Sequence, residues 1–170
     1  MDVRFTFLKD NDRDTAIYQN ALDVLAPHVA HPDPGSQFDY VIRSMGSGSP
    51  KSKIIRLMPQ GFDALLGVKD EKVVSFLALK HKSATKPTAV FRVYTAPEYE
   101  RNGIARKSVE HLVNTCFDQG QKLLYVSRGK SEAVTAVLCS LKRNYQGPYL
   151  LDVQPETGLI AALTPSDFPL

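Results

Sequence analysis

Residues 94–105 read Tyr-Thr-Ala-Pro-Glu-Tyr-Glu-Arg-Asn-Gly-Ile-Ala and form the most informative segment of this chain. An apolar run typical of a strand, residues 88–95, leads into it, and an apolar helical pattern over residues 104–119 follows. A strand that turns tightly into a helix leaves the first backbone N–H groups of that helix without partners. With the positive end of the helix dipole, these donors form a site for phosphate or diphosphate. Gly103 and Ala105 favour such a site, because small side chains let a ligand approach the backbone.

The same segment resembles motif A of the GNAT superfamily of acyl-CoA-dependent N-acyltransferases, which runs Pro-Glu-Tyr followed by Gln/Arg-x-x-Gly-x-Gly/Ala. The residues in register with that motif are Pro97, Glu98, Tyr99, Gly103, Ile104 and Ala105. Glu100 departs from it, because the family usually has Gln or Arg there and a carboxylate next to a diphosphate is unfavourable. Arg101, the next residue, could supply the missing positive charge.

The resemblance implies transfer of an acyl group from acyl-CoA, most simply acetyl-CoA, to a primary amine that attacks it directly. It implies that the diphosphate of this co-substrate is held by the backbone of Glu100, Arg101, Asn102, Gly103, Ile104 and Ala105. A main-chain N–H at Thr95 or Ala96 would stabilise the developing oxyanion. No metal is expected, and the four histidines and two cysteines show no metal-ligand spacing.

The general base stays open at the level of the sequence. Amines with a pKa of about 10.4 are protonated at neutral pH, so a group must deprotonate them directly or through water. Glu98 is the nearest carboxylate in the sequence, whereas Tyr94 and His81 flank the expected cleft. For His81 the preferred interpretation is an exposed residue of a polar loop.

The second family motif, motif B, is degenerate at residues 133–145. The family pattern is Asn-x-x-Ala-x-x-x-Tyr closed by Gly-Phe, and its Tyr protonates the leaving CoA thiolate. Aligning Asn144 and Tyr145 with Gly-Phe places Ala136 on the family Ala but Ser140 on the Tyr. A serine hydroxyl is a much weaker acid than a phenol, so Ser140 is a weak candidate for the catalytic acid, and water is the alternative.

Composition and charge narrow the class of protein. The 170 residues suffice for one domain over residues 1–170, and a net charge of +3 from scattered Lys and Arg argues against a nucleic-acid partner. Cys116 and Cys139 fit buried small hydrophobes in a reducing compartment, although Cys139 could also donate a proton. Without a signal peptide or a long apolar segment, a cytoplasmic protein without membrane contact is expected. The basic pairs Arg106-Lys107 and Lys142-Arg143 are surface residues or counterions for CoA.

Periodicity predicts the element order β-α-α-β-β-β-α-β-α-β-β. The predicted strands span residues 3–7, 64–69, 72–80, 88–95, 123–126, 149–153 and 159–163, and the predicted helices span residues 12–25, 37–44, 104–119 and 131–143. The strand–helix–strand unit at 88–127 requires a parallel strand pair. The fold class expected from this order and from the resemblance is α/β, with a mixed, mostly antiparallel central sheet containing one parallel pair and flanked by helices.

Local signals predict where these elements end. Pro27 and the prolines after it are expected to end the first helix, and residues 46–53 are expected to form an exposed loop. Asp70-Glu71 is expected to form a tight hairpin turn. Asn144 is expected to take a left-handed cap conformation after the last helix.

Three functional hypotheses remain open. The first is an N-acyltransferase acting on an amine of a small molecule or a protein, with a homodimer possible. The second is a GNAT-fold sensor or interaction module that binds acyl-CoA and transfers slowly or not at all, a possibility raised by Glu100 and the degenerate motif B. The third is an α/β interaction protein without a phosphate site. Binding of CoA and release of CoA in the presence of amines separate the three.

Overall fold

The strand–turn–helix predicted from the sequence is present in the computed structural model, which describes residues 2–32, 34, 36–127 and 131–163. The strands are β1 (Arg4–Phe7), β2 (Phe62–Lys69), β3 (Lys72–Lys80), β4 (Thr88–Thr95), β5 (Leu123–Val126), β6 (Leu150–Gln154) and β7 (Leu159–Leu163). The helices are α1 (Ala16–Ala30), α2 (Gln37–Ser44), α3 (Pro50–Leu57), α4 (Ile104–Asp118) and α5 (Glu132–Asn144). All the strands belong to one sheet in the order β1-β2-β3-β4-β5-β7-β6.

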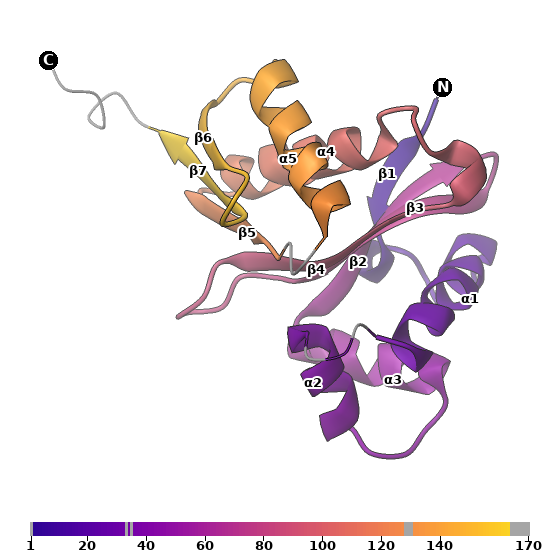
Figure 1. Ribbon diagram of the computed structural model, residues 1–170. Helices are drawn as coiled ribbons and strands as arrows, with labels where there is room; N and C mark the ends of the chain where they lie inside the picture. Colours follow the sequence, from indigo (N-terminus) through magenta and orange to yellow (C-terminus); the bar gives the residue numbers. More distant parts are fainter. Residues whose placement is uncertain (1, 33, 35, 128–130, 164–170) are drawn as a thin grey trace, which may run out of the picture.

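Helices cover both faces of the sheet. Figure 1 shows α1, α2 and α3 on one side and α4 and α5 on the other. Successive strand residues point to opposite faces, so Leu65 of β2 packs in the α4–α5 cluster whereas Leu66 packs in the α1–α3 cluster. Both leucines are fully buried. The sheet therefore separates two apolar cores, one of which supports the predicted phosphate turn.

The strand pairing confirms the expected fold class. Neighbouring strands are antiparallel except β4 and β5, which run parallel with Thr88 opposite Leu124 and Val90 opposite Val126. α4 supplies the crossover between these two strands. The parallel pair predicted for the strand–helix–strand unit at residues 88–127 is thus confirmed.

The parallel pair is short, and this shapes the site. β5 accompanies β4 only over Thr88–Val90, whereas β4 continues beside β3 until Thr95 lies opposite Ser75. Leu79 lies opposite Val90 and the preceding Ala78 lies opposite Arg92, so Phe91 is the extra residue of a β-bulge. Within the described residues, the edge of β4 that faces away from β3 has no strand partner over residues 91–95.

Two predictions near the N-terminus are wrong. Pro27 does not end the first helix: α1 runs to Ala30, and the carbonyl of Pro27 accepts a hydrogen bond from the N–H of His31 at 3.0 Å. Burial of Leu25 and Val29 outweighs the one N–H that proline lacks. The segment 46–53 is only partly a loop, because α3 begins at Pro50.

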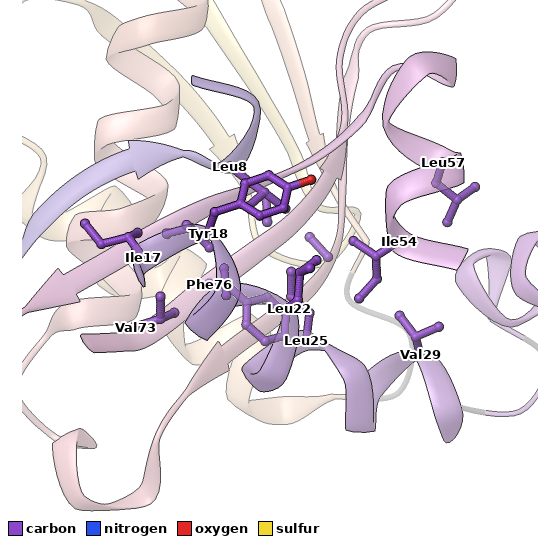
Figure 2. Close-up of a cluster of buried hydrophobic side chains, with 14 of the residues drawn as sticks. Leu8, Ile17, Tyr18, Leu22, Leu25, Val29, Ile54, Leu57, Val73 and Phe76 are labelled. Atoms are coloured by element: carbon purple, nitrogen blue, oxygen red, sulfur yellow. The ribbon is translucent and has the colours of Figure 1, made fainter. Parts of the chain in front are cut away.

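The start of α3 follows ordinary capping rules. The side chain of Ser49 accepts a hydrogen bond from the N–H of Ser52, and Pro50 occupies the first turn, where its missing N–H costs nothing. In the sequence, the glycines and serines that precede the helix are typical of an exposed loop, so these capping residues did not predict a helix. Ile54 and Leu57 of α3 are buried against α1 and the sheet, which Figure 2 shows together with Leu25 and Val29.

The predicted turn geometry is correct at one place and wrong at another. Asp70 and Glu71 both have positive φ, 51° and 62°, which makes the tight β2–β3 turn. Asn144 is not a left-handed cap: it remains helical, and its side-chain amide donates to the carbonyl of Ser140 at 3.0 Å. Cys116 is buried as expected, whereas Cys139 is half-buried.

No helix in the described part of the chain has the length and apolar character that crossing a membrane requires.

The contact between Gly67 and Ser75 gives a test of this packing. A Cβ at Gly67 would lie 2.1 Å from the Ser75 Oγ, a buried oxygen without a hydrogen-bond partner among the described residues. We expect Gly67→Ala to lower the free energy of unfolding by about 1–3 kcal/mol through overpacking. Ser75→Ala should be nearly neutral, because it removes an unsatisfied hydroxyl.

Urea denaturation of both single variants and of the double variant measures the coupling. The double variant should regain much of the stability that Gly67→Ala loses. Strictly additive effects would show that the two residues do not clash.

Candidate functional site

A cleft of about 510 Å³ lies where β4, the β4–α4 turn and α5 meet. It is on the α4–α5 face of the sheet, next to the unpaired edge of β4. Its lining residues are Val93, Thr95, Tyr99, Glu100, Arg101, Gly103, Ile104, Ala105, Arg106, Ser131, Ala133, Val134, Ala136, Val137 and Ser140. The cleft therefore brings together two segments, residues 93–106 and 131–140, that are separated by 24 residues in the sequence.

The turn between β4 and α4 has an unusual backbone. Arg101 and Gly103 are both left-handed, with φ of 66° and 72°. The side-chain amide of Asn102 donates to the carbonyls of Tyr99 and Glu100, each at 3.1 Å, and holds the turn closed. Gly103 adopts this conformation without cost, whereas Arg101 does so at a cost because it carries a side chain.

Free backbone donors result from this turn. The first hydrogen bond of α4 runs from the N–H of Lys107 to the carbonyl of Gly103, at 3.0 Å. The N–H groups of Ile104, Ala105 and Arg106 precede it, and all three residues line the cleft. The positive end of the helix dipole is at the same place. Residues 100–106, where the sequence predicts a diphosphate site, thus form a cradle of backbone donors along the cleft.

Charged side chains surround the cradle. Arg106 is held by Glu110, with 3.0 Å between Nη1 and Oε2, and a Cβ at Gly103 would lie 3.9 Å from its Nη2. Arg101 and Glu100 are exposed at the same wall. Glu110 balances Arg106, so Arg101 is the guanidinium group at the cradle without an ion-pair partner among the described residues, and Glu100 lies beside it in the sequence. In the sequence, Arg106 was recognised only as half of a basic pair.

Most of the residues predicted to bind the cofactor line this cleft. Those that do are Thr95, Glu100, Arg101, Gly103, Ile104 and Ala105. Asn102 acts on the turn rather than on the cleft. The N–H of Ala96 donates to the carbonyl of Val74 at 2.8 Å, so it is already used within the sheet.

The predicted catalytic residues are distributed differently. Ser140 lines the cleft, opposite the turn. Tyr94 points to the other face of the sheet, where its ring lies 4.6 Å from that of His28 and 5.1 Å from that of Phe76. Glu98 is exposed on a short 3₁₀ helix, Pro97–Tyr99, and is not part of the lining.

His81 is not the exposed loop residue that the sequence indicated. Its Nε2 lies 2.7 Å from Oδ2 of Asp63, whose side chain is fully buried. The other carboxylate oxygen of Asp63 accepts from the backbone N–H groups of Lys9 and Ala64. His81 follows the end of β3 that pairs with the start of β4, about 20 Å of strand from Thr95. The pair ties the N-terminal segment to the sheet and lies away from the cleft.

The face of α5 that lines the cleft carries small residues at helical spacing, Ala133, Ala136, Val137 and Ser140. This spacing could have identified the second wall from the sequence alone. The Oγ of Ser140 accepts from the amide of Asn144 at 3.3 Å.

The one phenol of motif B points elsewhere. The hydroxyl of Tyr145 donates to Oδ1 of Asn114 at 2.7 Å, and its ring packs against the α4–α5 core. Burial raises the pKa of this phenol. Tyr145 is therefore a packing residue, and Ser140 is the motif B residue with a hydroxyl group that lines the cleft.

The fold combines a mixed sheet that holds one parallel strand pair with a helix whose first N–H groups face a cleft beside that pair. A family model of the acetyltransferase (GNAT) family matches residues 41–136. The chain belongs to that family. A search of curated proteins gave no significant match.

Solved structures agree in fold. Tetrahymena GCN5 superposes with a TM-score of 0.60 at 12% identity, covering 95% of this chain and 97% of that chain. The PaiA N-acetyltransferase from Thermoplasma acidophilum, in complex with coenzyme A, gives 0.52 at 15% identity, covering 94% and 97%. The yncA protein from Salmonella typhimurium, with its cofactor acetyl-CoA, gives 0.52 at 13% identity, covering 91% and 83%. At these identities the likeness shows the fold alone.

The left-handed turn gives a prediction about Gly103. Space around a Cβ at this position is open, so the cost of a side chain is conformational, about 1–2 kcal/mol for an ordinary residue. We expect Gly103→Ala to weaken CoA binding by about fivefold to thirtyfold, since 1.4 kcal/mol is a factor of ten. Gly103→Asn should lose less, because Asn tolerates the left-handed region. Calorimetric titration with CoA measures both, and equal losses would contradict the conformational explanation.

Proposed function

We propose that the protein is an N-acetyltransferase that transfers an acetyl group from acetyl-CoA to a primary amine. The observation that carries this proposal is the unpaired edge of β4 leading directly into the free N–H groups of α4. The diphosphate would lie on the N–H groups of residues 104–106, with Arg101 and Arg106 as counterions. The amide groups of the pantetheine arm would lie along the edge of β4, as an added strand does.

The oxyanion donor follows from the direction of the backbone. The N–H of Ala96 points to β3, and N–H groups alternate along a strand. The N–H groups of Thr95 and Val93 therefore point away from β3, towards the edge where the acyl group would lie. A preorganised main-chain donor at this edge stabilises negative charge on the thioester oxygen.

The described residues of the cleft offer few side chains for proton transfer. The acidic residue of the cleft lining is Glu100, which is exposed beside the cradle. We propose that water takes the proton of the amine and that Ser140, or water held by it, protonates the thiolate. A thiolate leaves without strong acid assistance, so this arrangement supports slow to moderate transfer.

A second candidate is acyl-CoA binding without transfer. Among the described residues motif B contributes no phenol to the lining of the cleft, where the phenol present is Tyr99 of the turn. This difference from the family pattern, together with Glu100 beside the cradle, favours the second candidate. It predicts tight binding of CoA with no release of CoA across a broad panel of amines. The neighbours include aminoglycoside acetyltransferases, so such a panel includes aminoglycosides, polyamines and simple monoamines.

The transferase proposal is tested first by binding and then by turnover. Acetyl-CoA at 100 times its dissociation constant should stabilise the fold by about 2.7 kcal/mol in thermal unfolding. With a suitable amine, free thiol should appear. We expect Ser140→Ala to reduce kcat less than tenfold, because its hydroxyl is a weak acid. A larger drop with unchanged affinity for CoA would make Ser140 the essential acid, and no thermal shift would refute the proposal.

The charge of Glu100 gives an independent prediction. Removing a carboxylate near the diphosphate should strengthen binding of CoA by about twofold to fivefold in low salt, and high salt should abolish the difference. Glu100→Gln is the test, and Glu98→Gln is the matched control, since Glu98 is equally exposed but does not line the cleft. An equal change in both variants would show that overall charge, and not the position of Glu100, sets the affinity.

A further inference from the structure

A second hollow, of about 40 Å³, lies on the opposite face of the sheet from the cofactor cleft. Its walls come from α1, α3, β2 and β3. The buried residues that form most of these walls are Leu25, Val29, Ile54, Leu57, Ala64 and Ala78. Figure 2 shows how Leu25 and Val29 of α1 lie near Ile54 and Leu57 of α3 in this part of the core. The hollow is a built apolar pocket assembled from four elements.

The mouth of the hollow is aromatic. Phe38, Met58, Phe62 and Phe91 are half-buried, in contrast to the buried walls. The ring of Phe91 stacks on that of Phe38 at 6.5 Å and lies 5.9 Å from that of Phe62. Solvent therefore reaches the hollow past these side chains.

The hollow offers no charge to a ligand. Asp63 is the one charged residue in its lining, and hydrogen bonds from His81, Lys9 and Ala64 engage its carboxylate. A cation lies beside the mouth: the Lys80 ammonium is 5.2 Å from the centre of the Phe62 ring. A second ammonium carried into this space would lose its hydration without gaining a partner.

The hollow and the cofactor cleft meet at β4. Phe91 lines the hollow and Val93 lines the cleft, so two residues, about 7 Å of strand, separate them. Between these residues β4 has already lost its pairing with β5. The hollow and the acyl end of the proposed site are therefore neighbours along β4.

We propose that the acceptor is a primary monoamine with a short apolar tail, which the hollow binds, in contrast to a polyamine or an aminoglycoside. One water molecule needs roughly 10–15 Å³ by this measure, so the hollow holds about three water-sized groups. That room fits an alkyl tail of three or four carbons. The assignment of the hollow to the acceptor rests on the proposed acetyl transfer; the apolar preference of the hollow does not.

Pentylamine and putrescine form a matched pair of probes. Both carry a primary amine on a four-carbon spacer, but pentylamine ends in a methyl group and putrescine in an ammonium. We expect pentylamine to bind the full chain at least tenfold more tightly in titrations followed by NMR at neutral pH, with and without CoA. Equal affinity, tighter binding of putrescine or no binding of either amine would overturn the inference.

Two variants locate the binding. Ala78→Leu fills the hollow and should abolish pentylamine binding while CoA binding persists. Met58→Glu puts a carboxylate at the mouth and should shift the preference towards putrescine. Met45→Glu is the control and should not shift it, because Met45 is also half-buried but lies outside the hollow. Pentylamine binding that both Ala78→Leu and Met58→Glu leave unchanged would overturn the inference.

These results are separable from the proposed function. Binding of CoA, and release of CoA with other amines, would still support the proposed transfer even if pentylamine did not bind in the hollow. Conversely, failure of CoA to bind would refute the transferase proposal, while the amine titrations without CoA would still decide whether the hollow prefers an apolar tail.

Discussion

The site depends on the point where the hydrogen-bonded ladder between β4 and β5 stops. β5 pairs with β4 over Thr88–Val90, and β4 then continues to Thr95 with β3 as its one strand neighbour in the described part of the chain. A row of unpaired backbone groups on a strand edge favours the addition of another extended chain. Here the open edge points into a cleft whose far end carries free N–H groups and guanidinium groups. The proposed co-substrate, acyl-CoA, has amide groups that would pair with the open edge of β4. Its diphosphate would bind the N–H and guanidinium groups.

The β-bulge at Phe91 distributes the side chains of β4 between two sites. In a regular strand Phe91 and Val93 would share a face, and Tyr94 would share the opposite face with Val90. Instead Val90 and Val93 both belong to the α4–α5 core, whereas Phe91 and Tyr94 contact residues on the α1–α3 side. One inserted residue therefore gives the cofactor cleft one wall and the apolar hollow part of its mouth.

Much of the fold was predictable because its signals are local. β3, β4, β5 and β7 have the predicted bounds, since each is an apolar run between polar turns. The errors occur where distant contacts override local preference. Pro27 stays helical because Leu25 and Val29 are buried beside it, and the pairing of His81 with Asp63 depends on the register of β2 against β3, which no local pattern encodes.

The same distinction divides the site into two halves. In the cofactor half, the wall formed by the turn lies within one short segment, Thr95 to Arg106, and offers backbone groups, so a motif predicts it even where Glu100 departs from the pattern. The other half is the apolar hollow, which is lined by side chains from several helices and strands. Tyr94 shows the consequence: it is next to Thr95 in the sequence but faces the opposite side of the sheet. The proposed cofactor site follows a family pattern, whereas the proposed acceptor site follows none, so the acceptor must be determined on this chain itself.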